Sequence, residues 1–429
     1  MWCQAILSIH FSCILYINFD YCLLICVYFI YRSKKIESLI LFISTIVFLG
    51  FLLVPLSKSL GAPILLLILI GGMLVGEDGP GNIDFEDFEL AYSLGSIALA
   101  IILFAGGLET KIRTLKGSRT VSVFLASFGV LITTGIVGAA ASYMLNIPIE
   151  HGLLLGAVVA STDAAATFML IQQNQINLPS RLSNTLVLES GINDPMAIFL
   201  TIALTAIVNQ GAQIGGETAL TFLPLFLQQI GIGVTFGVIG GIGLAKILDN
   251  IQIPVGLHPP MALAGAMAIF AATSILGGSG FLAIYLCGLI VIDQIKKSAE
   301  RILNFGEALQ WLSQIVLFFM LGLLVTPSDL PDTAVPALMI AFVLMFFARP
   351  LAVFICAIPA RFSIKETTYL SWVGLRGAVP IFLAIFPIIT PGPIETDFFN
   401  IVFVIVVVSL VLQGWTVASS AKWLGLIEK

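Results

Sequence analysis

Charged residues are scarce in this chain: Asp, Glu, Lys and Arg together make up 10% of its 429 residues, while 59% are hydrophobic. Soluble domains need charge to cover their surfaces. The mean hydropathy of +1.08 excludes a set of such domains built around ordinary cores. The composition therefore predicts an all-α polytopic membrane protein.

Histidine and cysteine are also few, with three and six residues. The cysteines form no CxxC pair and have no histidine at metal-ligand spacing, so we expect neither a resident metal nor a cofactor. The stretch GGSG at 277–280 matches a nucleophile motif of intramembrane proteases, but all three histidines precede Ser279. A glycine-rich run at 231–246 lacks the GK[ST] of a nucleotide-binding loop. These motifs argue against an enzyme.

Long polar stretches are missing as well. Crossing the hydrocarbon layer of a membrane takes ~20 predominantly apolar residues in a helix. Thirteen runs of comparable size, separated by polar residues, Gly or Pro, predict helices near 38–57, 60–76, 90–108, 120–145, 150–172, 183–209, 219–247, 258–277, 281–294, 307–326, 333–358, 367–389 and 397–418. The longest polar connections, 77–89 and 109–119, are too short for a separate domain. Any chemistry must therefore lie within the helix bundle.

Basic residues are distributed unevenly between the two sides of the predicted bundle. If the helix at 38–57 enters from the outside, 14 of the 19 Lys and Arg residues lie on the cytoplasmic side, and acidic loops gather on the other. This bias predicts a multi-pass protein of the cell (inner) membrane, with a membrane domain at 38–429 and a cytoplasmic C-terminus. Residues 1–37 depart from the pattern because RSKK at 32–35 would face outward. We interpret them as an N-terminal extension: an extra helix, a leader, or an upstream start that is not the natural one.

The thirteen predicted helices divide into six at about 38–209, a linker helix at about 219–247 and six more at about 258–418. In this orientation the second six run in the opposite sense to the first, which is the inverted-repeat architecture of many secondary transporters. The helix at 150–172 then corresponds to the helix at 367–389. Both carry a polar interruption, STDAAAT in the first and GLRGAVP in the second.

Five ionisable residues lie well inside apolar runs, namely Asp163, Glu189, Asp194, Arg349 and Arg376. Each would cost ~2.5–3.5 kcal/mol at the centre of a membrane helix, so they must pair, face water or bind a ligand. If all are ionised, three carboxylates and two guanidinium groups leave one surplus negative charge. Such a site suits a single monovalent cation or a single proton. We expect Glu189 and Arg349 to be structural, because a matched ion pair leaves no vacancy for a ligand.

The segment ESGINDP at 189–195 places polar side chains on two helix faces. Glu189 and Asn193 are four residues apart and share one face, while Ser190 and Asp194 share the adjacent face, about 100° round. Carboxylate, hydroxyl and amide oxygens suit hard cations such as sodium or potassium, and an aspartate can hold a proton in the same place. One face can therefore serve structure while the other binds the ion.

Five motifs make the chain resemble a known family: ASTDAAATFMLI, LVLESGINDPMAIFLT, WLSQIVLFFMLGLLVTPSDL, FARPLAVF and WVGLRGAVPIFLAIFP. They resemble the monovalent cation:proton antiporters of the NhaP type, and most closely the potassium/proton branch called cell volume regulation protein A. The resemblance covers roughly Leu39–Leu426. It implies thirteen helices in a dimerisation domain and a core domain, a homodimer, and two broken helices that cross near the ion site.

The resemblance also implies roles for individual residues of the ion site. By motif, Thr162 and Asp163 lie at the break of the first crossing helix, and Asp194 is the carboxylate that binds either the cation or the proton. Ser190 would assist coordination. Asn193 resembles the electroneutral members of the family, in which only one of two adjacent positions is acidic.

Further residues are assigned a structural place by the same motifs. Glu189 and Arg349 match a buried ion pair that braces the core, and Arg376 lies in the second broken helix near Gly374 and Gly377.

One position departs from the family, whose members commonly have an acidic residue before the paired glycines of the third helix. The stretch here reads FAGGLET, with Ala105 at that position, so the accessory carboxylate is missing there.

These observations predict a secondary active antiporter that exchanges potassium and/or sodium for protons, electroneutrally and 1:1, with both ions competing for Asp194. The role would be in pH homeostasis. The alternative is a cation channel or ion sensor that uses the same intramembrane charges. Charges able to neutralise one another around one vacancy favour a discrete site with alternating access. The expected partners are potassium or sodium, the proton, the lipid bilayer and a second copy of the chain, with no nucleic acid.

Overall fold

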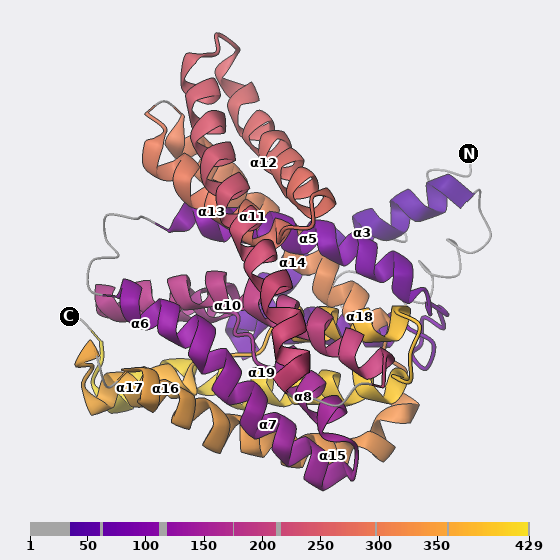
Figure 1. Ribbon diagram of the computed structural model, residues 1–429. Helices are drawn as coiled ribbons and strands as arrows, with labels where there is room; N and C mark the ends of the chain where they lie inside the picture. Colours follow the sequence, from indigo (N-terminus) through magenta and orange to yellow (C-terminus); the bar gives the residue numbers. More distant parts are fainter. Residues whose placement is uncertain are drawn as a thin grey trace, which may run out of the picture.

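The computed structural model describes residues 35–60, 63–110, 118–174, 176–211, 216–296, 298–357 and 360–427. Within these residues every regular element is helical (Figure 1). In this described part, nine helical segments are long and apolar enough to cross a membrane, and four shorter apolar helices accompany them. The prediction of an all-helical, multi-pass membrane protein is confirmed. Most of the predicted N-terminal extension lies outside the described residues.

The first half of the chain alternates long helices with short ones. Its elements are α3 (Lys35–Leu60), α4 (Ile64–Val75), α5 (Phe88–Glu109), α6 (Arg119–Phe124), the π-helical turn η2 (Leu125–Gly129), α7 (Val130–Leu145), α8 (Ile149–Val158), α9 (Ala164–Gln173) and α10 (Ser180–Asn209). Because η2 joins α6 to α7 without a gap, these three elements form one span.

The second half begins with a long helix and repeats the alternation. Its elements are α11 (Gly216–Asn250), η3 (Val255–Leu257), α12 (His258–Ile275), α13 (Gly280–Gln294), α14 (Ala299–Leu323), η4 (Pro327–Asp329), α15 (Leu330–Val343), the π-helical turn η5 (Leu344–Ala348), α16 (Arg349–Ala357), α17 (Ile364–Trp372), α18 (Ala378–Ile389) and α19 (Thr396–Leu424). Here η5 joins α15 to α16 in the same way that η2 joins α6 to α7.

Capping side chains fix several helix ends. The Asp87 carboxylate accepts a hydrogen bond from the Leu90 N–H at 2.8 Å and so caps α5. The Ser279 hydroxyl does the same for α13, accepting from the Leu282 N–H at 3.3 Å after Gly277 turns the chain with a φ of +77°. The GGSG stretch is therefore a helix-capping turn between α12 and α13.

Glycines let α11 lie close against α13. A Cβ on Gly237 would come within 2.8 Å of the Ala283 carbonyl oxygen, and one on Gly233 within 2.9 Å of the Ser279 carbonyl oxygen. Such backbone-to-backbone approach is the usual use of small residues between membrane helices. The glycine-rich run of α11 is thus a packing surface.

The helices form two groups that meet along α5, α10, α14 and α18. One group contains α4, α5 and α11–α14, and the other contains α6–α10 and α15–α19. In Figure 1, α11, α12 and α13 project at the top, while α7, α15, α16 and α17 lie at the bottom. The contacts of α18 with α5 and α14, and of α10 with α5 and α13, join the two groups, and the candidate site lies at this junction.

Candidate ion-binding site

Two interrupted helices meet inside the helix group that contains α6–α10 and α15–α19. The first stops at Val158 and resumes at Ala164, and the other stops at Trp372 and resumes at Ala378. The Asp163 N–H in the first gap donates to the Leu375 carbonyl in the second at 2.8 Å. The two polar stretches that the sequence singled out, at 161–167 and 374–380, therefore touch each other.

Arg376 satisfies the main chain at the first interruption. Its side chain is 1% exposed, and its Nη1 donates to the carbonyl oxygens of Ala160, at 2.8 Å, and Ser161. The last carbonyls of a helix lack partners inside that helix and carry partial negative charge. The guanidinium group thus satisfies two main-chain carbonyls in the gap after α8 and places its positive charge near the C-terminal end of that helix.

The second interruption is held by α19. The Arg376 N–H donates to the Ser409 hydroxyl at 3.0 Å, and this hydroxyl donates in turn to Gln413 Oε1. The Gln413 amide donates to the Trp372 carbonyl at 2.8 Å, at the end of α17. These two residues of α19 were not predicted from the sequence, although both are polar residues within an apolar run.

Asp163 begins the second part of the first interrupted helix. Its Oδ1 accepts a hydrogen bond from the Ala166 N–H at 2.9 Å, which is the geometry of a helix N-cap. A Cβ on Gly377 would overlap the other carboxylate oxygen of Asp163, and one on Gly374 would lie 2.6 Å from Arg349 Nε. Both glycines are therefore needed because neighbouring side chains approach the main chain closely.

Helix α10 carries its polar residues to the first interruption. The Ser190 hydroxyl donates to the Thr162 carbonyl at 2.6 Å, and the Asn193 amide donates to the Thr162 hydroxyl, also at 2.6 Å. Both residues are buried, and Asn193 Oδ1 has no hydrogen-bond partner among the described residues. The structure thus brings Thr162, Ser190 and Asn193 together.

Asp194 lies one residue further along α10 and is 5% exposed. Within the described part of the chain, its Oδ1 has no hydrogen-bond partner. It lines a cavity of about 60 Å³ together with Asp163 and Ser190. This volume is several times the space that one water molecule requires. A small cation with part of its hydration shell would fit beside the carboxylate.

Glu189 and Arg349 form a paired group behind the cavity. Arg349 Nη1 lies 2.5 Å from Glu189 Oε1, and Nη2 lies 3.0 Å from Oε2, which is a bidentate contact. The two residues are 1% and 4% exposed. The pair connects α10 to the start of α16, and it leaves the Glu189 charge neutralised.

The opposite wall of the cavity comes from the other helix group. It includes Glu109 at the end of α5, Tyr285 of α13, and Gln310 and Gln314 of α14. The two glutamine side chains are 6% and 1% exposed, and the Oε1 atom of each has no partner among the described residues. Sequence reasoning missed these residues. A usable signal was the four-residue spacing of two glutamines in a largely apolar helix, which puts both on one face.

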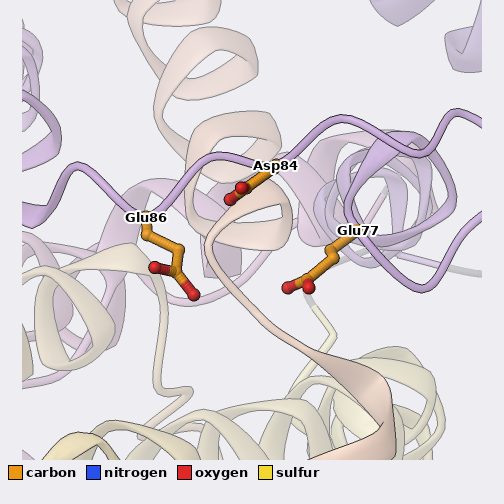
Figure 2. Close-up of side chains that lie close together, drawn as sticks. All are labelled: Glu77, Asp84 and Glu86. Carbon is orange, nitrogen blue, oxygen red and sulfur yellow. The ribbon is translucent and has the colours of Figure 1, made fainter.

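A separate acidic cluster lies in the loop between α4 and α5. Figure 2 shows Glu77, Asp84 and Glu86 with their carboxylates turned toward one another, and one oxygen of each lies within 4.8 Å of the others. All three residues are exposed. The pKa of Glu77 is raised by desolvation and then by repulsion from nearby acids, including Asp84 and Glu86. The loop lies outside the membrane-spanning helices and at the opposite end of α5 from Glu109.

Two interrupted helices that meet beside a buried carboxylate in a two-group helical membrane protein define the class of secondary ion transporters. Comparison with known proteins identifies the family within that class. The family described as "Sodium/hydrogen exchanger, transmembrane" matches residues 43–423, so the chain belongs to it.

Individual relatives and a solved structure agree with this assignment. The chain is 43% identical to the "K(+)/H(+) antiporter NhaP2" of Shewanella oneidensis, over 91% of this chain and 67% of that protein. It is 44% identical to the "K(+)/H(+) antiporter NhaP" of Alkalimonas amylolytica, over 92% of this chain and 68% of that protein. The structure of the sodium proton antiporter MjNhaP1 from Methanocaldococcus jannaschii superposes with a TM-score of 0.78 at 26% identity, covering 91% of this chain and all of that one. The chain spans about two thirds of the length of the two potassium relatives.

Family membership confirms three predictions made from the sequence. The resemblance to cation:proton antiporters reflects membership of the sodium/hydrogen exchanger family. The protein is a transporter and not an enzyme. Its activity is the exchange of a monovalent cation for a proton.

Proposed function

We propose that the protein exchanges one potassium ion for one proton in each cycle and that both ions compete for Asp194. The observation that carries this proposal is the Asp194 Oδ1 atom, which is buried in a cavity and has no partner among the described residues. A buried, unpartnered carboxylate is unfavourable unless it binds a proton or a cation. The same atom can therefore hold either ion, but not both at once.

The charges around the cavity support an electroneutral exchange. Of the five ionisable residues that lie inside apolar runs, Glu189 and Arg349 neutralise each other, so Asp163, Asp194 and Arg376 remain. Two carboxylates and one guanidinium group leave one surplus negative charge, which one potassium ion or one proton cancels. Asn193, an amide next to Asp194, adds no further charge.

The neighbouring oxygens complete the proposed coordination. The Asn193 amide nitrogen is occupied by Thr162, so its Oδ1 is left as an acceptor. Ser190 lines the same cavity beside Asp194, and its hydroxyl donates to the Thr162 carbonyl. Carboxylate, amide and hydroxyl oxygens are the ligands that hard monovalent cations prefer.

The names of the relatives favour potassium over sodium. The relatives at 43% and 44% identity are named as potassium/proton antiporters. The "Na(+)/H(+) antiporter 1" of Methanocaldococcus jannaschii is 30% identical over 79% of this chain and 80% of that protein. We therefore propose potassium as the physiological cation.

The proposed architecture is thirteen membrane helices in two inverted repeats, at about 38–209 and 258–418, with a linker helix at about 219–247. Corresponding irregularities support it. A π-helical turn interrupts the fourth helix of each repeat, at η2 and η5, and the fifth helix of each repeat is broken, between α8 and α9 and between α17 and α18. Broken helices at the repeat interface are where such transporters bind their ions.

We further propose a homodimer in the cell membrane with the C-terminus in the cytoplasm. The orientation is supported by the acidic loop between α4 and α5 on the proposed outer side and by the bias of Lys and Arg to the other side. Rocking of the group α6–α10 and α15–α19 against the group α4, α5 and α11–α14 would expose Asp194 to each side in turn.

The test is dissipation of a pH gradient in proteoliposomes, with potassium, sodium and lithium added separately. Wild type, Asp194→Ala and the control Asp84→Asn, which alters an exposed loop acid, are compared. We expect potassium-dependent proton flux in the wild type and the control and none in Asp194→Ala. Exchange that persists in a folded Asp194→Ala protein would refute the role of this residue. Cation flux without proton movement would instead indicate a channel.

A further inference from the structure

The cavity that contains Asp194 has a third acidic residue on its wall. Glu109 is the last residue of α5 and is exposed, whereas Asp194 is 5% exposed. Both line the same cavity, so it extends from the end of α5 into the interior. Among its described lining residues none is basic. The described wall of the cavity would therefore offer a cation at the end of α5 an attractive potential.

Side-chain amide oxygens line the cavity wall between Glu109 and Asp194. Gly306 of α14 lies next to Leu108 of α5, since a Cβ on Gly306 would be 3.0 Å from Leu108 Cδ1. Gly306 is followed along α14 by Gln310 after about one turn and by Gln314 after about two turns, so both glutamines lie further into the bundle than the end of α5. The Oε1 atoms of both glutamines lack partners among the described residues. Amide oxygens of this kind can replace water around a cation.

A second carboxylate lies near the first at the end of α5. Glu307, in the turn of α14 beside Leu108, lies within electrostatic reach of Glu109. The Glu307 side chain is exposed and is not part of the cavity wall. It adds to the negative potential at the end of α5, while Glu109 alone of the two faces the path to Asp194.

We propose that Glu109 is the entry carboxylate through which a cation reaches Asp194 from the end of α5, with the amide oxygen of Gln310 as the next contact. The proposal rests on the exchange at Asp194. Glu109 would raise the local cation concentration and the rate of cation entry without binding the ion during exchange. In the orientation proposed above, this is the cytoplasmic entrance. Glu109 lies about one helical turn after Ala105, the position at which this chain lacks the acidic residue common in the family.

The experiment measures potassium-dependent proton flux in vesicles of both orientations as a function of potassium concentration. The variants are Glu109→Gln, Glu109→Asp and Gln310→Leu, and the matched control is Glu300→Gln, an exposed acid in the first turn of α14 that is outside the cavity. Gel filtration and thermal unfolding verify that each variant is folded.

We expect Glu109→Gln to raise the apparent KM for potassium by about three- to tenfold, with kcat within about twofold of wild type, because an entry residue acts before the ion is bound. The increase should appear only when potassium is offered at the α5 end, and it should shrink at high ionic strength. Glu109→Asp should resemble the wild type, and Gln310→Leu should share the KM increase.

Three results would overturn the inference. These are a KM for Glu109→Gln equal to that of Glu300→Gln, an equal effect from both sides of the membrane, or a loss confined to kcat. A wild-type protein without potassium-dependent proton flux would refute the proposed function instead, so the two failures can be distinguished.

Discussion

The Arg376 guanidinium group donates to the main-chain carbonyl of Ala160 at 2.8 Å, so one interrupted helix closes the open end of the other. This contact connects residues 216 positions apart. The geometry of the ion site therefore depends on both interruptions. The segment that Arg376 holds at Ala160 continues to Thr162, which forms hydrogen bonds with Ser190 and Asn193 of α10.

Replacing Arg376 should therefore damage folding as well as transport. In Arg376→Ala the carbonyl oxygens of Ala160 and Ser161 lose their partner, at about 1–3 kcal/mol for each buried acceptor. Arg376→Lys can still donate to one of them and should be milder. Thermal unfolding in detergent, followed by size-exclusion chromatography, measures the difference. Equal melting temperatures for wild type and Arg376→Ala would contradict this role.

The Glu189–Arg349 pair should behave as a coupled unit. Removing either partner leaves a buried charge unpaired, which typically costs about 3–5 kcal/mol. The double variant Glu189→Ala plus Arg349→Ala leaves no unpaired charge and should lose less stability than the two single variants combined. A thermal-unfolding cycle over all four proteins tests the coupling. Strictly additive losses would refute it.

Asp163 should separate a structural role from an electrostatic one. Asp163→Asn keeps an oxygen that can cap α9 but removes the charge, so we expect weaker cation binding with nearly unchanged stability. Asp163→Ala also removes the cap, at about 1 kcal/mol. Apparent potassium KM and melting temperature, measured on both variants, give the two effects separately. Equal loss of stability in both would show that the cap is not the stabilising contact.

Gly377 should tolerate no side chain. Its added methyl group would overlap the Asp163 carboxylate, and such overpacking costs about 1–3 kcal/mol. Gly377→Ala should therefore lower both the melting temperature and potassium-dependent flux. Gly243→Ala is the control, because a Cβ there has nothing within 4 Å and lies in a helix, where Ala is favoured over Gly. Normal flux in Gly377→Ala would mean that the two interruptions can separate without loss.

Two adjacent acids of the loop between α4 and α5 should respond to substitution in opposite directions. Hydrogen bonds from the Ser328 hydroxyl and N–H lower the pKa of Asp78, whereas the pKa of Glu77 is raised by desolvation and by neighbouring acids. A carboxylate with a lowered pKa stabilises the folded state above its unfolded pKa, and one with a raised pKa opposes folding when ionised.

At neutral pH, Asp78→Asn should consequently lower the melting temperature slightly, and Glu77→Gln should leave it unchanged or raise it. The deficit of Asp78→Asn should shrink as the pH falls from the ordinary Asp value of 3.8 toward the lowered pKa of the folded protein, because the wild-type unfolded chain binds a proton over this range and the folded carboxylate does not. Melting curves over a pH series measure both effects. A lower melting temperature for Glu77→Gln than for Asp78→Asn at neutral pH would contradict the assignment.

Hydropathy and charge predicted the membrane class of the fold because a spanning helix must be apolar along its whole length. The same physics singled out the buried charges, since an ionised side chain in lipid needs a reason to be there. Local spacing could not predict that Ser190 and Asn193 both reach Thr162, about 30 positions earlier in the chain. That contact depends on how α8 and α10 cross.

The wall supplied by α5 and α14 was not predicted for a similar reason. Glu109 lies at a predicted helix end, where an acidic residue is ordinary, and Gln310 and Gln314 are uncharged. None of them stands out by hydropathy alone. They form a wall because the two helix groups meet there, which is a property of the three-dimensional arrangement.

The two π-helical turns present the same pattern of side chains. LASFG at 125–129 and LMFFA at 344–348 share a leucine at the first position, a phenylalanine at the fourth and a small residue at the fifth. Leu125 and Leu344 are both 0% exposed, whereas Phe128 and Phe347 are 55% and 57% exposed. The first and fourth side chains of the two turns therefore point the same way, a leucine into the bundle and a phenylalanine out of it, so each widened turn holds its span in one rotational setting.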